Sequence, residues 1–514
     1  MDGNVSRRRF VKGIVGTTAG LSVWPMWTLA RQRSQPKRPN ILFLMDDQHR
    51  GDCIGAAGAT WLQTPNLDRL ANEGALFVKA YSSLPSCLPA RTSLLTGKSP
   101  WHHGMLGYRP IPPRFTHEKP RMFSEAGYRT HGVGKMHFAS HDHGYQSIVL
   151  EEAWRLPAGK FKCDYRQWFE KHHPDKDVDA TGLGYTDHRG HRPFLYDDDL
   201  HPTNWTAERG IDFLETYAGD KPWLLKVSFK RPHPPFDPPK RWLQHYERVE
   251  LPMPKVGQWA RGKTGAAVGS LEKSPNATRG RFPDDEIRAS RQAYFASISH
   301  VDEQIGRVLK ALKKRGEFEN TLILFTADHG DMMGDHYLWR KCYAYEGAAH
   351  VPMIVRWPKS LGIEARRGQI IKQLVELRDV LPTFLDAAGI TRPAELDGMS
   401  MLDLIQGRTQ HWRKVLDLEH AQIYWKGNSW LALTDGRYKY IYFTLTGEQQ
   451  LFDLDTDPHE MNNLADEAAH AERVGHWRQR LVEHVSVRGP AWVKDGDLTV
   501  QKKALYYSPH FPKK

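Results

Sequence analysis

Two short acidic stretches carry side chains that can hold a metal ion. Asp46 and Asp47 follow the apolar run ILFLM, and Asp328 and His329 follow the apolar run TLILFTA. We expect both runs to be buried strands, and in open α/β sheets ligands bind at the carboxyl ends of the strands. One acidic pair alone is more often a turn or a helix cap, but two pairs at strand ends predict a metal site. Carboxylate oxygens favour calcium, magnesium or manganese, and the histidine leaves room for a softer metal.

A cysteine lies near the start of another stretch, SCLPARTSLLTG, at residues 86–97. Cys87 lies two residues before Pro89 and four before Arg91, at the start of a predicted short amphipathic helix that ends at Gly97. A thiol near the amide donors of a helix N-terminus has a lowered pKa and can act as a nucleophile. The more ordinary interpretation is a small buried apolar side chain, which is the usual role of a free cysteine.

The scaffold follows from apolar runs that alternate with helical patterns. A long helix is expected from Gln292 to Gly316, and a shorter one over TPNLDRLANEG, which has a threonine cap and a proline at its first position. Strands separated by helices predict an α/β fold, with a large, mostly parallel central sheet flanked by helices on both faces. The expected buried strands are 41–45, 223–229, 321–326 and 352–355.

The C-terminal part of the chain carries a different pattern. LALTDGRYKYIYF (431–443) predicts a hairpin that turns at Asp435 and Gly436, and QLFDL (450–454) predicts a further strand. A helix is expected around 465–483. These elements predict a smaller C-terminal α+β subdomain that contains an antiparallel sheet. Two stretches, 158–204 and 253–290, are instead expected to be long loops because glycine and charged or polar residues dominate them.

The N-terminus resembles an export signal. SRRRFVKG precedes a weakly apolar run that is too short and too rich in glycine and threonine for a comfortable membrane span. It resembles a twin-arginine signal peptide over 1–30, with cleavage after Ala30 and no stable membrane span afterwards. The alternative is a retained N-terminal anchor. We therefore expect a periplasmic or extracellular protein with a catalytic α/β domain at 39–390 and the smaller subdomain at 391–514.

Bulk composition restricts the function classes. The chain has 514 residues and a formal net charge of +12, which favours anionic substrates, although a basic solvated surface gives the same number. No nucleic acid partner is expected, since no basic helix with interleaved aromatic residues and no zinc-finger spacing occurs. Four cysteines are too few for a disulfide framework, and we expect Cys53, Cys163 and Cys342 to be structural. Nothing in the sequence sets an oligomeric state.

These motifs together resemble a known family. CLPARTSLLTG is similar to the signature of the type I (formylglycine-dependent) sulfatases, which belong to the alkaline-phosphatase superfamily. Other stretches resemble further blocks of that family and occur in the family's order. They are GYRTHGVGKMHF (127–138), RPHPPFDPP (231–239), TADHGDMMGDHYLWRKC (326–342) and LFDLDTDPHEMNNLA (451–465).

The resemblance implies a modified nucleophile and one divalent cation. In the family, a formylglycine-generating enzyme or maturase oxidises the cysteine of the signature to formylglycine, an aldehyde that becomes hydrated. Cys87 matches that cysteine. Asp46, Asp47, Asp328 and His329 match the side-chain ligands of the cation, which is usually Ca²⁺, and the modified residue at Cys87 supplies a further ligand oxygen.

The resemblance also implies the groups that handle charge and protons. Arg91, Lys135 and Lys341 resemble the cationic residues around the hydrated aldehyde and the sulfate. His137 and His233 resemble the two acid–base histidines. A sulfate ester carries a spread negative charge, and its leaving alkoxide gains more as the S–O bond breaks, so fixed cations would stabilise the transition state.

Three functions are consistent with these residues. The leading hypothesis is an exported sulfatase that hydrolyses a sulfate ester, on a small molecule or on a sulfated carbohydrate or glycan. The second is a formylglycine-dependent hydrolase of phosphonate monoesters or phosphodiesters. The third is a noncatalytic protein that binds sulfated glycans, which the intact set of candidate catalytic residues disfavours.

Overall fold

The computed structural model describes residues 38–138, 141–152, 162–184, 189–261 and 277–512. The predicted signal peptide, at 1–30, lies outside the described residues, and so does its cleavage point. Within the described ranges, no helix is both long and apolar enough to cross a bilayer.

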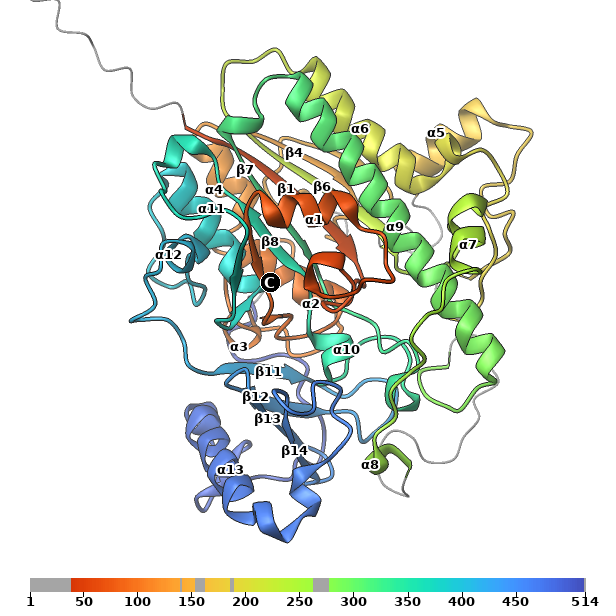
Figure 1. The fold of residues 1–514 in the computed structure, drawn as a ribbon. Helices are drawn as coiled ribbons and strands as arrows, with labels where there is room; N and C mark the ends of the chain where they lie inside the picture. Colours follow the sequence, from red (N-terminus) through yellow and green to blue (C-terminus); the bar gives the residue numbers. More distant parts are fainter. Residues whose placement is uncertain (1–37, 139–140, 153–161, 185–188, 262–276, 513–514) are drawn as a thin grey trace, which may run out of the picture. The chain divides into compact units, whose positions relative to one another are not determined.

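A central sheet of eight strands carries the fold, in the order β5-β4-β6-β1-β7-β8-β2-β9. Figure 1 labels β4, β6, β1, β7 and β8 of this sheet. Neighbouring strands from β5 to β7 are parallel, and only β8 runs antiparallel to its neighbours. The predicted mostly parallel sheet is therefore confirmed. The strands are β1 (Asn40–Asp47), β2 (Ala75–Phe77), β4 (Arg129–Gly134), β5 (Ser147–Leu150), β6 (Trp223–Pro232), β7 (Thr321–Ala327), β8 (Met353–Arg356) and β9 (Gln369–Ile371). Two short strands, β3 (Ala80–Tyr81) and β10 (Val375–Glu376), pair separately.

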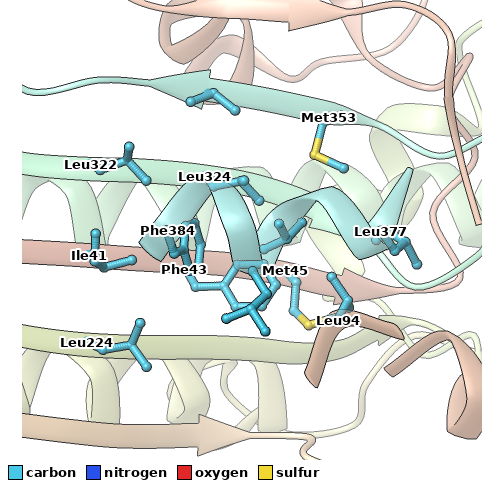
Figure 2. Close-up of a cluster of buried hydrophobic side chains, with 14 of the residues drawn as sticks. Ile41, Phe43, Met45, Leu94, Leu224, Leu322, Leu324, Met353, Leu377 and Phe384 are labelled. Carbon is cyan, nitrogen blue, oxygen red and sulfur yellow. The ribbon is translucent and has the colours of Figure 1, made fainter. Parts of the chain in front are cut away.

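Side chains of the central strand β1 alternate between two buried layers, because successive residues of a strand point to opposite faces. Ile41, Phe43 and Met45 contribute to one hydrophobic cluster, whereas Leu42 and Leu44 contribute to another. Figure 2 shows the first cluster. There the ring of Phe384 meets the ring of Phe43 edge-on, with centroids 5.5 Å apart. Both faces of the sheet are covered, which explains why its strands are continuously apolar.

Helices supply the partners of both layers. α9 buries Val301, Ile305 and Val308 in the second cluster, and α11 buries Phe384 in the first. α9 is longer than expected because it begins directly after Pro283, with three acidic residues in its first turn. The helices are α1 (Pro65–Asn72), α2 (Cys87–Thr96), α3 (Pro100–His103), α4 (Lys119–Glu125), α5 (Asp164–His172), α6 (Pro202–Thr216), α7 (Lys240–Tyr246), α8 (Gln258–Arg261), α9 (Asp284–Lys314), α10 (Glu346–Ala349), α11 (Val380–Ala388), α12 (Met401–Ile405) and α13 (Ala471–Val485).

The C-terminal part contains the predicted antiparallel sheet, with four strands in sequence order. Its strands are β11 (Leu416–His420), β12 (Trp430–Thr434), β13 (Tyr438–Phe443) and β14 (Gln449–Asp453). The turn between β12 and β13 lies at Asp435 and Gly436, as expected, with Gly436 at φ +87°. α13 packs on one face of this sheet through Trp477 and Leu481. A small hairpin, β15 (Val493–Lys494) and β16 (Asp497–Leu498), follows. The boundary at 390/391 stays a prediction.

Two expectations about local structure are wrong. The helix that begins at Cys87 is not amphipathic, since every residue of α2 except Leu88 is buried. The stretch 158–204, expected to be a long loop, contains α5 and the first turn of α6. Similarly, 253–290 contains α8 and the start of α9. α5 and α8 are short, and only the first turns of α6 and α9 lie in these stretches. Each such segment has too few buried apolar residues to show the 3.6-residue repeat of a helix.

Candidate active site

Four neighbouring parallel strands end at one edge of the central sheet, and each delivers residues to that edge. The register pairs Met45 of β1 with Thr326 of β7 and with Ser228 of β6, and pairs Ser228 with Gly134 of β4. The residues that follow these positions therefore lie together. They are Asp46 and Asp47 as the last two residues of β1, Asp328 and His329 after β7, His233 after β6, and Lys135 and His137 after β4.

Cys87 approaches the same edge as the first residue of α2. Cys87 is 2% exposed, and the preceding residue, Ser86, is the N-cap of the helix and has an extended backbone. The helix stops at Gly97, where φ is +67°. Cys87 lies with three strand-end residues in one buried group, in which ligand atoms of Asp47, Cys87, Asp328 and His329 are all within 4.8 Å of one another. The structure thus brings together four of the five predicted metal-binding residues in one cluster.

The hydrogen bonds of His329 fix the atom that it presents. Nδ1 lies 2.9 Å from the carbonyl oxygen of Gly330, and Nε2 lies 3.2 Å from the sulfur of Cys87. A carbonyl accepts only, so Nδ1 carries a proton and donates, and Nε2 is the nitrogen that faces the cluster. This is the arrangement that a metal-binding imidazole requires.

Asp46 lies beside the cluster and has one oxygen available. Its Oδ2 is 2.7 Å from Nδ1 of His49, whereas its Oδ1 is buried without a hydrogen-bond partner among the described residues. Burial, opposed in part by His49 and reinforced by the neighbouring carboxylates of Asp328 and Asp47, raises the pKa of Asp46. Burial and Asp47 raise the pKa of Asp328 as well. A buried oxygen without a partner among crowded carboxylates fits a divalent cation, which would supply both the missing partner and the missing charge.

Arg91 joins the two acidic strand ends from one turn further along α2. Its Nε donates to Asp328 at 2.8 Å and its Nη2 donates to Asp47 at 3.0 Å. Its Nη1 donates to the carbonyl of Lys135 at 2.5 Å and to Ser228 Oγ at 3.1 Å. All three nitrogens therefore bind the protein, and the guanidinium positions the carboxylates.

Two lysines face the thiol. Lys341 Nζ lies 2.9 Å from the sulfur of Cys87 and 3.2 Å from Gln48 Oε1, and Lys135 Nζ lies 3.9 Å from the sulfur. Lys135 also forms an ion pair with Asp47. Burial and Asp47 raise the pKa of the Cys87 thiol, but the charges of Lys135, Lys341 and His329 outweigh them and hold that pKa well below its ordinary value. Position 87 therefore favours a negatively charged group.

The two candidate acid–base histidines lie at the ends of β4 and β6. Nδ1 of His233 is 2.9 Å from the carbonyl of Pro234, so Nδ1 carries a proton and donates there. His137 adopts φ +59°, and its backbone N–H donates to Glu152 Oε2 at 2.7 Å.

The cations of the site act on Asp47. Burial raises the pKa of Asp47, yet Lys135, His233, Arg91 and Lys341 together hold that pKa well below its usual range.

The family model for sulfatases matches residues 39–390, which is more than half of the chain. This chain belongs to the sulfatase family. Its reaction class is the hydrolysis of sulfate esters. A second family model, described as "N-sulphoglucosamine sulphohydrolase, C-terminal", matches residues 334–486.

Individual relatives agree with this assignment. The sulfatase is 38% identical over 465 residues to an arylsulfatase of Clostridium perfringens (strain 13 / Type A), covering 88% of this chain and 95% of the relative. It is 32% identical over 455 residues to a choline-sulfatase of Rhizobium meliloti (strain 1021), covering 84% and 83%. Among solved structures, the phosphonate monoester hydrolase of Agrobacterium radiobacter superposes with a TM-score of 0.71 at 26% identity, covering 88% and 96%.

Four residues that the motifs did not single out hold the site together. His49 binds Asp46, and Gln48 binds Lys341 through its side chain and Asp328 through its backbone N–H. Ser228 accepts a hydrogen bond from Arg91, and Glu152 accepts one from the backbone N–H of His137. His49 could have been found from its spacing of three residues after Asp46, but the others act across distances that no local pattern encodes.

Proposed function

We propose that this sulfatase hydrolyses the sulfate ester of a carbohydrate, through a formylglycine made from Cys87 and one divalent cation, calcium. The observation that carries the proposal is the surrounding of the Cys87 sulfur by Lys341, His329 and Lys135 at 2.9, 3.2 and 3.9 Å. The carbohydrate substrate is supported by the glucosamine sulphohydrolase model that matches residues 334–486 and by the net charge of +12, which suits an anionic glycan.

Two groups would complete the site. The cation would be held by Asp46, Asp47, Asp328 and His329 together with the residue at position 87, and it would supply Lewis-acid stabilisation of negative charge. Formylglycine would supply a hydrated aldehyde, with one hydroxyl to attack sulfur and a second through which sulfate can later be expelled. A separate modifying enzyme or maturase is the partner that makes it.

The fixed cations of the chain perform the electrostatic part of the reaction. Lys341 and Lys135 face position 87, so they would bind sulfate oxygens and oppose the charge that accumulates as the S–O bond breaks. Arg91 would act as a positioning residue, because it holds Asp47 and Asp328 in place. The site is arranged before substrate arrives, since Arg91, Lys135 and Lys341 are all buried.

The histidines move the protons. His233 would donate a proton from Nε2 to the leaving oxygen, because its Nδ1 is engaged with the carbonyl of Pro234. His137 would accept the proton from the second hydroxyl at position 87 and so restore the aldehyde. Its Nδ1 is buried and has no hydrogen-bond partner among the described residues.

We also propose that the protein is exported. The support is the SRRRFVKG stretch, with its paired arginines ahead of a weakly apolar run. A protein that is exported by this route folds before it crosses the membrane, so modification of Cys87 would precede export. Fractionating cells that produce the full chain tests this, with Arg7→Lys, Arg8→Lys and Arg9→Lys combined as the matched variant. The proposal expects the variant to stay in the cytoplasm, and equal export of both proteins would contradict it.

One observation favours a second activity. The likeness to a phosphonate monoester hydrolase extends over 88% of this chain, so hydrolysis of phosphonate monoesters is the alternative. The test compares kcat/KM for 4-nitrophenyl sulfate with that for 4-nitrophenyl phenylphosphonate, using one preparation whose formylglycine content is known. A higher value for the sulfate is expected, and a higher value for the phosphonate would replace the sulfatase proposal. Cys87→Ala is the control and should hydrolyse neither.

A further inference from the structure

A cavity of about 660 Å³ lies beside the C-terminal antiparallel sheet, and the catalytic residues do not line it. Aromatic rings form much of its wall, among them Trp259, Tyr343 and Trp425. These rings are held in place by their neighbours. Trp259 stacks on Tyr345 with centroids 4.9 Å apart and donates from Nε1 to the carbonyl of Glu460 at 2.7 Å. Tyr343 lies 5.6 Å from Trp425. Rigid ring faces of this kind bind flat apolar surfaces at a small entropic cost.

Two amide side chains lie in the wall, those of Asn463 and Gln450. Asn463 accepts at Oδ1 from the backbone N–H groups of Leu451 and Ala465, at 2.9 and 3.2 Å. Gln450 accepts at Oε1 from the hydroxyl of Tyr345 at 2.8 Å. Neither amide nitrogen donates to another described residue. The cavity wall thus holds two amide donors beside apolar rings.

The charges around the cavity select against a polyanion. Its charged wall residues are Arg279, Glu448 and Asp466, so carboxylates outnumber cations. Arg279 lies over the ring of Trp425, with its guanidinium carbon 4.9 Å from the centroid. Carboxylates accept hydrogen bonds from hydroxyl groups but repel sulfate. The occupant must therefore combine apolar faces with hydroxyls that both donate and accept, and it must not carry sulfate there.

The cavity is close to the catalytic centre along the chain. Tyr343 in its wall is two residues from Lys341, so their Cα atoms are at most roughly 7 Å apart. Asn428, another wall residue, donates to the carbonyl of Cys342 between them at 3.2 Å. The segment 341–343 therefore connects Lys341, which faces the Cys87 thiol, with Tyr343 in the aromatic wall of the cavity.

We propose that this cavity binds a neutral sugar ring of an oligosaccharide substrate, apart from the ring that carries the sulfate. The pyranose stacks its C–H face on Trp425 or Trp259, and its hydroxyls accept from Asn463 and Gln450 and donate to Glu448 or Asp466. The inference rests on the proposed carbohydrate substrate and extends it, because it makes the preferred substrate longer than one sugar.

The test measures binding directly, by isothermal titration of the full protein with neutral trisaccharides of glucose, galactose and N-acetylglucosamine. At least one trisaccharide should bind in the millimolar range or tighter. Trp425→Ala should weaken that binding about tenfold, the effect of losing a stacked aromatic residue at a ligand site. Asn463→Asp, which keeps the acceptor for the backbone but removes the donor, should weaken it about fivefold. Tyr507→Ala, an exposed aromatic residue outside the cavity wall, is the matched control and should bind like the wild type.

Several results would overturn the inference. They are absence of binding to all three trisaccharides, unchanged binding by Trp425→Ala, and a change in sedimentation coefficient on that substitution without a change in sugar binding. The last result would assign the cavity to a second copy of the chain. Turnover of a sulfated monosaccharide, too small to occupy both places, tests the proposed function separately, so failure of one is distinguishable from failure of the other.

Discussion

Replacing Arg91 by methionine removes a cation that bridges two buried acidic strand ends. The guanidinium is 1% exposed, and both of its carboxylate partners, Asp47 and Asp328, are fully buried. Methionine keeps much of the aliphatic stem but none of the donors. The substitution therefore leaves two buried carboxylates with less charge compensation.

The magnitude follows from the contacts that are lost. Two hydrogen bonds to charged partners, at 2.8 and 3.0 Å, are each worth about 1.5–3 kcal/mol. Breaking one side of a buried ion pair costs about 3–5 kcal/mol in proteins generally. We expect Arg91→Met to lower the free energy of unfolding by about 3–5 kcal/mol.

Urea denaturation with a chelator present is the assay, because a bound cation would otherwise offset the missing charge. Arg478→Met is the matched control. It breaks a two-bond pair with Asp497 of similar length, 2.7 and 2.9 Å, but the side chains are 27% and 59% exposed. Exposed pairs contribute about 0–1 kcal/mol. The reasoning is refuted if Arg91→Met costs no more than Arg478→Met.

Three further predictions follow from other parts of the structure. His233→Asn should lower turnover of alkyl sulfates by about 10²–10⁴-fold but affect 4-nitrophenyl sulfate less, since a good leaving group needs no proton; equal losses would exclude the role of general acid. Calcium at 100 times the wild-type dissociation constant should add about 2.7 kcal/mol to the stability of the wild type, and the same calcium concentration should add less to Asp46→Asn in thermal melts; an equal gain would remove Asp46 from the ligands. Burial lowers the pKa of His131 to about 4, below its value of about 6.5 in the unfolded chain, so its contribution to stability is present above pH 6.5 and is lost as the pH falls toward 4. His131→Gln should reduce the slope of unfolding free energy against pH in that window by about 1.4 kcal/mol per pH unit, and an unchanged slope would show that His131 is charged in the fold.

Local patterns predicted the strands and therefore the place of the site. The apolar runs before Asp46 and before Asp328 are β1 and β7, which are parallel neighbours, so the two acidic pairs meet as expected. This worked because the carboxyl ends of parallel strands share one edge. The C-terminal hairpin at Asp435 and Gly436 was equally predictable, since its turn residues are specific.

Long-range pairing was not predictable in the same way. Arg91 was expected to face the sulfate, but its donors bind residues on β1 and β6 and residues directly after β4 and β7. Gln48 contacts Asp328 from 280 positions away. α2 was expected to be amphipathic, with one side exposed to solvent. In the structure all of its residues except Leu88 are buried. Such contacts depend on which strands become neighbours, and no spacing within one segment contains that information.

Mass spectrometry of the tryptic peptide AYSSLPSCLPAR, residues 80–91, from protein made in its native host tests the central claim most directly. We expect an aldehyde in place of the Cys87 thiol in the active fraction, trapped by a hydrazine reagent. Sulfate ester turnover should rise in proportion to the aldehyde content. Unmodified cysteine throughout a fully active preparation would contradict the account and return Cys87 to the role of an ordinary thiol.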